Sequence, residues 1–415
     1  MAKISPFRAV RPNKVYVESV ASFPYDVVSS AEARIIAADN PLSFLHISKA
    51  EIDFPEDVTF SDPAVYEKAK SNLRLFQDRE ILIQDAKPLF YIYSQKMGEH
   101  RQYGIVATVH VSEFESGQVK RHELTLPEKQ EDRTRHFETL CAQTGPIFLA
   151  YRANEEINRI VEEVVSEDDP EYDFTMPDGI QHTVWIISGA QQISAITKIF
   201  ARIDSLYIAD GHHRAASAVE VARRLRNSNK NHAGNEEYNF ILSVLFPHDQ
   251  LKIMDYNRAV VDLNGLSKTD FMKNISESFD VEEDFKEKSP QSLHHFGMYV
   301  DGKWYKLIAK PACFETKDII GALDVSILQN CLLKPILGIG DPRQDKRIKF
   351  IGGIRGMAEL EKIVDSGDYA VAFSMYPPTL DQMFQVADAG EIMPPKSTWF
   401  EPKLRSGLFV HLLDQ

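Results

Sequence analysis

One segment, residues 206–226, constrains the fold and chemistry of this chain more than any other. An apolar run typical of a buried strand is followed by a short turn and then by an alanine-rich stretch that predicts a helix. The junction between strand and helix reads Asp210, Gly211, His212, His213, Arg214. Cationic side chains in a first helical turn are unfavourable, because the N-terminus of a helix already carries a partial positive charge. A bound anion removes this repulsion. Free backbone N–H groups, a glycine and several donors then converge, so the sequence predicts a phosphate site.

The same pentapeptide also has a purely structural interpretation. In that interpretation Asp210 caps the helix, Gly211 serves the turn and the two imidazoles are solvated. We take phosphate binding as the working hypothesis, because two histidines followed by an arginine are unusual at the start of a helix.

A second group of donors lies near the C-terminus, in the stretch 391–407. Three prolines and an adjacent Trp-Phe pair stiffen this stretch, and its donors include Lys396, Ser397, Thr398, Lys403 and Arg405. A rigid basic loop is a good second clamp for a phosphate. The alternative is an ordinary surface loop with a salt-bridged lysine.

Further candidates are scattered along the chain, and each has a plain alternative. The residues are Asp26, Ser43, His122, Glu123, Arg133 and Arg355. Neighbouring imidazole and carboxylate groups suit general acid–base work or metal binding, but they also occur on charged helix faces and in turns. A glycine-rich stretch that holds Arg355 follows Asp341-Pro342-Arg343. This region either wraps a second phosphate or only reverses the chain.

Composition narrows the class of function. The 415 residues carry a formal net charge of −14, which argues against nucleic-acid binding because that function needs a basic face. Three scattered cysteines fit a reducing compartment. The start MAKISPFRAV lacks the apolar core of a secretory signal, and no stretch approaches the roughly 20 apolar residues of a membrane span. We therefore expect a cytoplasmic protein without membrane contact. Signatures of P-loop, dinucleotide-binding, zinc-protease, serine-hydrolase and protein-kinase sites are missing.

Alternating strand and helix patterns predict a mixed α/β fold in several layers. We expect helices from Ser29 and over Ser61–Asp78, and strands over Leu89–Ser94, Tyr103–Val111, Pro146–Tyr151 and Phe240–Phe246. The prolines in Pro6–Ser29 favour strands and turns, with Val15-Tyr16-Val17 as one apolar run. Four segments are expected: an α/β region over 1–120, a central region over 121–265, a small inserted subdomain over 266–312, and an α/β region over 313–415.

Several of these segments together resemble the SerK-like family 1015 of bacterial domains of unknown function. The matching stretches are Tyr25-Asp26-Val27, 40–46, Arg121-His122-Glu123 with Asp132-Arg133, Asp210–Arg214, Asn257-Arg258 and Met393–Gly407. The resemblance runs from Pro6 to the C-terminus. It implies a ParB/sulfiredoxin-like phosphate-binding element, because the pentapeptide looks like the phosphate-gripping motif of free serine kinases.

The resemblance also implies an activity: transfer of a phosphoryl group from pyrophosphate to L-serine, giving O-phosphoserine, with Mg²⁺. In that hypothesis Gly211, His212, His213 and Arg214 hold the donor phosphate, and Lys396, Ser397 and Arg405 hold its other end or neutralise the leaving group. The base or magnesium ligand is Asp210, Glu123 or Asp26, in falling order. One rival hypothesis is a serine kinase that uses ATP or ADP as the phosphoryl donor. Another is a non-catalytic protein that senses phosphate or a nucleotide. DNA binding is the least favoured of the alternatives. A homodimer is compatible with all of them.

Overall fold

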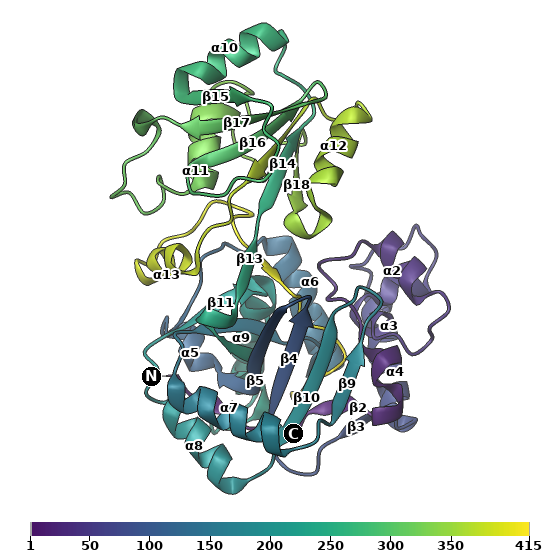
Figure 1. The fold of residues 1–415 in the computed structure, drawn as a ribbon. Coiled ribbons are helices and arrows are strands. Elements are labelled where there is room, and N and C mark those ends of the chain that lie inside the picture. The colour runs from purple at the N-terminus through teal and green to yellow at the C-terminus, as the bar shows by residue number, and fades with distance from the viewer. Residues whose placement is uncertain (1, 415) are drawn as a thin grey trace. The chain divides into compact units, whose positions relative to one another are not determined.

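The computed structural model describes residues 2–414, and the chain divides into two compact units (Figure 1). Unit 1 comprises residues 2–120, 125–251 and 402–414, and unit 2 comprises residues 121–124 and 252–401. Both units combine helices with sheets, so the predicted mixed α/β class is confirmed. No helix within residues 2–414 is long and apolar enough to cross a lipid bilayer.

Unit 1 is built on a nine-stranded mixed sheet. Its strands are β1 (Ile4–Ser5), β4 (Phe90–Met97), β5 (His100–His110), β6 (Val119–Lys120), β8 (Ile147–Tyr151), β9 (Tyr172–Thr175), β10 (Gln181–Ile187), β11 (Leu206–Asp210) and β12 (Phe240–Pro247). The order is β6-β11-β8-β12-β5-β4-β10-β9, with β1 added on β5. Two small ribbons pair β2 (Val10–Pro12) with β3 (Leu82–Gln84) and β7 (Ala142–Gln143) with β21 (His411–Leu412).

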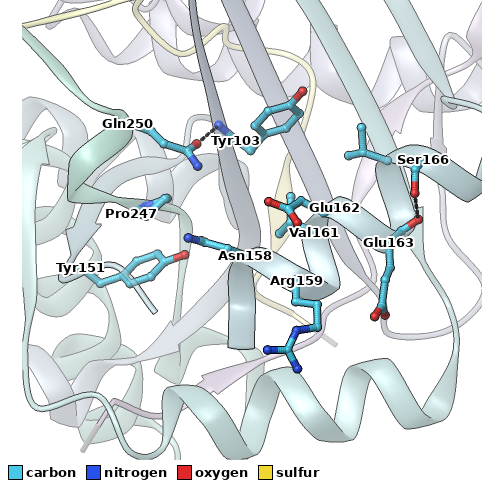
Figure 2. Close-up of a pocket in the computed structure, with 11 residues that line it drawn as sticks. Tyr103, Tyr151, Asn158, Arg159, Val161, Glu162, Glu163, Ser166, Pro247 and Gln250 are labelled. Atoms are coloured by element: carbon cyan, nitrogen blue, oxygen red, sulfur yellow. Dashed lines mark hydrogen bonds between the residues drawn. The ribbon is translucent and has the colours of Figure 1, made fainter. Parts of the chain in front are cut away.

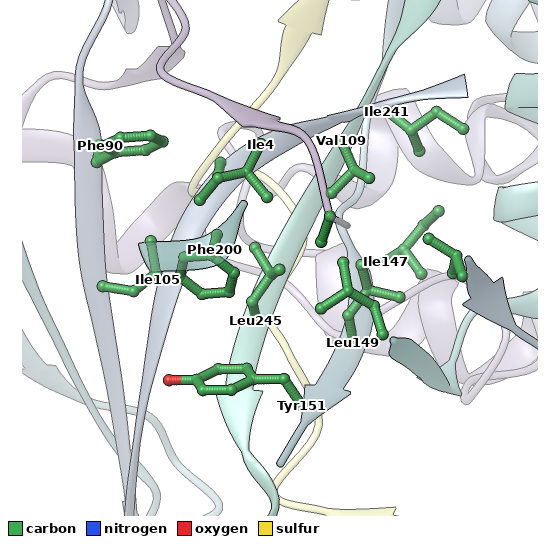
Figure 3. Packing of buried hydrophobic residues seen from close by; sticks show 14 of the residues in the cluster. Ile4, Phe90, Ile105, Val109, Ile147, Leu149, Tyr151, Phe200, Ile241 and Leu245 are labelled. Atoms are coloured by element: carbon green, nitrogen blue, oxygen red, sulfur yellow. The ribbon is translucent and has the colours of Figure 1, made fainter. Parts of the chain in front are cut away.

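Unit 1 also contains helices, of which the later ones pack on this sheet and the earlier ones form smaller cores with the β2–β3 ribbon and with one another. They are α1 (Val17–Val20), α2 (Ser30–Ala37), α3 (Leu45–Ser48), α4 (Pro63–Asp78), α5 (Val111–Glu115), α6 (Pro127–Leu140), α7 (Glu155–Glu167), α8 (Ala190–Phe200) and α9 (His212–Ser228). The main core joins strand residues such as Phe90, Leu149 and Leu245 to Phe200 of α8, and all four are fully buried (Figure 3). This core anchors β11 and α9, the two elements that flank the Asp210–Arg214 junction.

Unit 2 has a six-stranded sheet of its own in the order β15-β17-β16-β19-β14-β18 (Figure 1). Its strands are β14 (Tyr256–Val260), β15 (Phe279–Glu283), β16 (His295–Val300), β17 (Lys303–Ala309), β18 (Ile348–Gly352) and β19 (Val371–Met375). A separate ribbon pairs β13 (Lys252–Met254) with β20 (Trp399–Glu401). The helices are α10 (Lys268–Ser278), α11 (Asp324–Leu328), α12 (Met357–Asp365) and α13 (Leu380–Asp388), and one π-helical turn, Gln329–Leu333, continues α11.

The two units cut across the four segments expected from the sequence. The expected subdomain 266–312 supplies β15, β16 and β17, but these strands continue into one sheet through β19, which comes much later in the chain. Strand pairing therefore joins the stretch to the rest of unit 2. Long-range pairing of this kind leaves no mark in local composition.

The expectation of strands and turns near the N-terminus is partly wrong. Val15 and Tyr16 lie in a 3₁₀ turn, Lys14–Tyr16, and Val17 is the first residue of α1. The side chain of Asn13 accepts a hydrogen bond from the Val15 N–H at 3.4 Å, which starts a helical turn, and Val15 is 78% exposed. An apolar side chain in solvent gives the backbone no reason to join the sheet.

Candidate functional site

The junction between β11 and α9 depends on the conformation of Gly211. This glycine is the residue before the helix and has a φ of +93°, a left-handed conformation that other residues adopt only with strain. A Cβ atom at this position would lie 3.0 Å from Cζ of Arg214. The N-cap of α9 is Gly211, so the structural alternative in which Asp210 is the N-cap is wrong. A glycine at the N-cap offers no side-chain oxygen, and the first-turn N–H groups of a helix are a favourable place for an anion.

Arg214 turns back over the junction and is 5% exposed. Its Nη2 lies 3.0 Å from Oδ2 of Asp210 and 3.6 Å from Oδ2 of Asp26, and its Nη1 donates to the carbonyl of Pro146. Burial alone would lower the pKa of Arg214, but the charges of Asp26 and Asp210 raise it above its ordinary value. The guanidinium therefore stays charged and holds two carboxylates together.

Three arginines surround one short stretch of unit 1, the segment Ser22–Asp26. The Cζ of Arg405 lies 4.1 Å from the ring centre of Phe23, and the Cζ of Arg133 lies 4.1 Å from the ring centre of Tyr25. Arg214 forms the ion pair with Asp26 at the end of the segment. Cation–π and ionic contacts thus gather three guanidiniums that are far apart in the sequence.

Arg405 is the most enclosed of the three, with 1% of its surface exposed. Its Nε donates to Nε2 of His182 at 3.2 Å, and its Nη2 forms an ion pair with Asp178. Tyr93 ties the group together, since its hydroxyl is 2.8 Å from Nδ1 of His182 and accepts from the Arg405 backbone N–H at 3.3 Å. Burial, together with the charge of Arg405, holds the pKa of His182 well below its usual range, so this imidazole is neutral and can accept from Arg405.

Two of these buried arginines keep an N–H group that no described protein atom accepts. Nε of Arg214 and Nη1 of Arg405 are both shielded from solvent, and neither has an acceptor among residues 2–414. The stretch around Gly145 adjoins both regions, because a Cβ there would lie 4.0 Å from Nη1 of Arg214 and 3.6 Å from the hydroxyl of Ser406. A buried donor without an acceptor is unfavourable by about 1–3 kcal/mol. A bound oxyanion would relieve that penalty.

The carboxylate of Asp210 is held in its charged form. Burial would raise its pKa, but the positive charges of Lys403, Arg214 and His212 outweigh burial and lower the pKa to about 2. The Lys403 ammonium lies 3.4 Å from Oδ1 of Asp210. A carboxylate with so low a pKa is a weak proton acceptor at neutral pH and is better suited to holding positive charge.

Other predicted residues of unit 1 lie around this cluster in supporting positions. Ser43 is buried, its hydroxyl 3.0 Å from that of Ser22, and it accepts the Leu45 N–H at 3.3 Å. His212 is 7% exposed in the first turn of α9. His213 accepts the Leu126 N–H at its Nε2, 3.0 Å away, so this nitrogen already fastens the chain before α6.

The remaining predicted residues form a second group in unit 2. They are His122, Glu123, Arg355, Lys396, Ser397 and Thr398. Nε2 of His122 lies 3.1 Å from the Thr398 hydroxyl, and the His122 carbonyl accepts the Met393 N–H at 2.9 Å, so the stretch 121–124 is fastened to the proline-rich loop. Ser397 is buried and donates to the Pro394 carbonyl at 2.6 Å, whereas Arg355 and Lys396 are exposed.

The predicted magnesium ligands can be compared with what the ion requires. Asp26 and Asp210 contact the same nitrogen of Arg214, so their carboxylates lie close together. No group of three or more His, Cys, Asp or Glu side chains within residues 2–414 could hold a metal ion. Mg²⁺ is usually bound by one or two carboxylates together with water and substrate phosphates. The pair therefore fits an ion that arrives with a phosphate, rather than a cage formed by protein alone.

A cavity of about 490 Å³ opens elsewhere in unit 1 (Figure 2). Asn158 and Arg159 of α7 line one side of it, and Tyr151, Pro247 and Gln250 line the other. None of the residues predicted from the sequence as catalytic, phosphate-binding or metal-binding contributes to the wall of this cavity. The cavity and the arginine cluster are therefore separate features of unit 1.

Sequence reasoning missed part of the cluster. Asp178 lies just before β10 and His182 lies in it. Nothing in the local sequence pattern marks either residue as a partner of Arg405. Phe23 precedes the matching stretch Tyr25-Asp26-Val27, and an aromatic residue beside a proline is a weak signal. The sequence predicts Lys403 as a donor in the basic stretch, but it does not indicate its partner Asp210.

Comparison with known proteins decides the family. The family described as protein of unknown function (DUF1015) matches residues 4–326. The chain belongs to the DUF1015 family. Among curated proteins, none matches it.

Solved structures show only distant similarity to this DUF1015 protein. A free serine kinase in complex with AMP is 15% identical, with a TM-score of 0.35 over 73% of this chain and 92% of that one. A conserved hypothetical protein from Pyrococcus furiosus is 15% identical, with a TM-score of 0.36 over 74% and 95% of the two chains. SbnI from Staphylococcus aureus is 13% identical, with a TM-score of 0.38 over 74% and 87%. Scores this low carry no argument about the site.

Proposed function

We propose that this protein is a small-molecule phosphotransferase that moves a phosphoryl group from pyrophosphate to the hydroxyl of L-serine. The bridging P–O bond of pyrophosphate breaks, a P–O bond to the serine Oγ forms, and inorganic phosphate leaves with the hydroxyl proton. The products are O-phosphoserine and phosphate. The proposal extends the fold and family of the chain to an activity, and it places the donor site in unit 1.

One observation carries the proposal: two buried guanidiniums beside the Ser22–Asp26 segment each hold an N–H without an acceptor among the described residues. Nε of Arg214 and Nη1 of Arg405 are charge-assisted donors, which bind phosphate oxygens strongly. The sequence predicts both residues as phosphate ligands, along with the amide of Gly211 and the first turn of α9. Phosphoryl transfer needs positioning and charge neutralisation above all, and this donor set supplies both.

We assign the carboxylates of Asp26 and Asp210 to Mg²⁺ that is brought in with the donor. When bound, this ion would neutralise the phosphate oxygens and leave Arg214 free to turn toward the substrate. Because the pKa of Asp210 is lowered to about 2, this carboxylate is charged throughout the neutral range and does not serve well as a base. A dissociative transfer requires little help from a base, so the assignment does not depend on one.

Residues of unit 2 predicted as phosphate ligands are left out of the proposed donor site. His122, Thr398 and Ser397 are linked by hydrogen bonds within their own unit, as described above. Phosphate binding by these three residues, by Arg355 and by Lys396, and the role of Glu123 as base or magnesium ligand, stay predictions from the sequence.

The test is a direct assay of the reaction by phosphorus NMR. The protein is mixed with Mg²⁺, L-serine and one donor at a time: pyrophosphate, ATP or ADP. We expect an O-phosphoserine signal with pyrophosphate, and none when L-alanine, which lacks the hydroxyl, replaces L-serine. A signal with ATP or ADP alone would replace pyrophosphate as the donor. Binding of all three donors without any product would overturn the enzyme assignment in favour of a sensor.

A further inference from the structure

Unit 2 contains a buried arginine with an unusual environment, Arg258. It lies in the middle of β14, between β18 and β19, where it faces Phe350 on one side and Phe373 on the other in the strand register. Only 4% of its surface is exposed. A charge taken out of water into a sheet interior is strongly unfavourable unless a partner compensates it.

No carboxylate in the described part of the chain compensates this charge. Nη2 of Arg258 donates to the Lys396 carbonyl at 3.0 Å, and the Phe350 ring centre lies 5.3 Å from Cζ. Nη1 is shielded from solvent and has no acceptor among residues 2–414. The ion pairs described for neighbouring arginines of unit 2 do not include Arg258. Burial lowers its pKa to about 10, the opposite of the direction for Arg214, whose carboxylate partners raise the pKa.

Arg258 lies in the wall of a cavity of about 370 Å³ within unit 2. Its apolar wall includes Phe350, Leu333 and Pro395. The stretch Asp341-Pro342-Arg343, singled out in the sequence, forms another part, and Arg343 is paired there with Asp341 at 3.1 Å. Because that pair neutralises itself, Arg258 supplies the net charge of the wall. The volume lies within the range of small-ligand pockets, roughly 300–1,000 Å³.

We propose that this cavity binds a small organic oxyanion, a carboxylate or a phosphate monoester on a compact apolar body, with its charge held by Nη1 of Arg258. The anion would accept the hydrogen bond from Nη1 of Arg258, for which the described residues offer no acceptor. The apolar body of the ligand would pack against Phe350 and Leu333. The pattern fits a ligand rather than a structural pair, because a purely structural arginine at this depth would be accompanied by a carboxylate. The site lies wholly in unit 2 and is independent of the donor site proposed in unit 1.

Titration calorimetry with matched small probes tests this proposal on the full-length protein. Benzoate and phenyl phosphate carry the two oxyanions on one ring, and benzamide keeps the ring but has no charge. We expect saturable binding of one or both anions, and at least tenfold weaker binding of benzamide. The stronger anion identifies the class of ligand. Equal binding of benzamide and the anions, or no binding of any probe up to ~10 mM, would overturn the proposal.

A variant pair locates the bound anion. Arg258→Gln removes the charge but keeps a polar side chain, and we expect it to weaken the preferred anion at least tenfold without lowering Tm, since an uncompensated charge is lost. Arg223→Gln, an exposed arginine of α9 in unit 1, is the control and should bind as the wild type does. Undiminished anion binding in Arg258→Gln would contradict the assignment. If that variant does not fold, the comparison of benzoate with benzamide still decides the question.

Discussion

The two units bury arginines in opposite ways. In unit 1, Arg214 is enclosed with Asp26 and Asp210, and Arg405 with Asp178, so each guanidinium has an anionic neighbour. In unit 2, Arg258 is enclosed without a carboxylate partner among residues 2–414. Burial acts on both sets, yet the pKa of Arg214 rises and that of Arg258 falls. Carboxylates compensate the buried charges of Arg214 and Arg405, whereas no described carboxylate compensates that of Arg258, and the proposed anion would do so.

The largest expected effect is on catalysis in unit 1. Arg214→Ala removes the donor shared by Asp26 and Asp210, and we expect O-phosphoserine formation to fall about a hundredfold, on the order of 3 kcal/mol in transition-state stabilisation. The rate is measured by phosphorus NMR with pyrophosphate as donor.

Arg223→Ala provides the control on the same helix. This arginine is exposed and pairs with Glu220 at the surface, so its removal should leave the rate unchanged. If Arg214→Ala is as fast as Arg223→Ala, the cluster is structural and the proposed donor site is wrong.

The second prediction concerns the response of each unit to pH. In unit 2, burial raises the pKa of Asp324 from 3.8 to about 7, although a hydrogen bond from the His294 N–H opposes the shift. The folded state thus holds this proton more tightly than the unfolded state. The contribution of Asp324 to the stability of unit 2 is therefore fully present below about pH 4. It is lost as the pH rises through about 7. In unit 1 the pH dependence has the opposite direction, because the pKa of Asp210 is lowered from 3.8 to about 2. Asp210 contributes stability above pH 3.8, and this contribution is lost as the pH falls through about 2.

Asp324→Asn separates these two responses. Asparagine keeps an acceptor for the His294 backbone N–H and removes the titration, so above about pH 7 the variant should have a higher unfolding free energy than the wild type, by up to about 4 kcal/mol. Chemical denaturation across this pH range measures the effect. A wild-type protein whose unit 2 stability does not change between pH 4 and 7 would refute the shift.

A third prediction tests the left-handed junction that aims Arg214. Gly211→Ala introduces a Cβ at a φ of +93° and 3.0 Å from Arg214, so we expect the unfolding free energy to fall by about 1–3 kcal/mol. Gly98→Ala is the matched control, because Gly98 also has a positive φ, of +59°, but has no described atom within 4 Å of a new Cβ. Equal losses in the two variants would mean that the close approach to Arg214 has no consequence.

The smallest expected effects come from one capped helix in each unit. Ser29 and Glu32 form a reciprocal capping box at α2, and Thr379 and Gln382 form one at α13. Ser29→Ala and Thr379→Ala should each lower the unfolding free energy by about 1 kcal/mol. If the units unfold in separate transitions, each variant shifts only the transition of its own unit. A variant that shifts both transitions alike would show that the two unfold together.

Local patterns predicted local elements well. The Ser29 start of α2 is confirmed with its capping box, and the strand–turn–helix at the pentapeptide is confirmed as β11 and α9. These features depend on side chains within a few residues of one another, so a single sequence contains the information. The Val15–Val17 run is helical instead of extended, because three consecutive apolar residues are too few to show a helical or strand period.

Distant pairings could not be predicted in the same way. The sequence marked Arg133, Arg214 and Arg405 as binding residues, but not their arrangement around Ser22–Asp26, which joins residues separated by more than a hundred positions. Nor does the sequence indicate that Arg258 is buried without a described carboxylate partner, because that depends on what β18 and β19 bring beside it. Burial and charge pairing are properties of the packed sheet rather than of the local stretch.

The central claim is that a phosphate oxygen accepts from the unpaired donors of the Ser22–Asp26 cluster. Nitrogen-edited NMR of the arginine side chains observes those donors directly, with Arg214→Lys and Arg405→Lys used for assignment. On saturation with pyrophosphate and Mg²⁺, we predict that the Nε–H resonance of Arg214 and the Nη1–H resonance of Arg405 shift and that their exchange with water slows. If pyrophosphate binds while both resonances stay unchanged, the phosphate lies elsewhere and the account of unit 1 is contradicted.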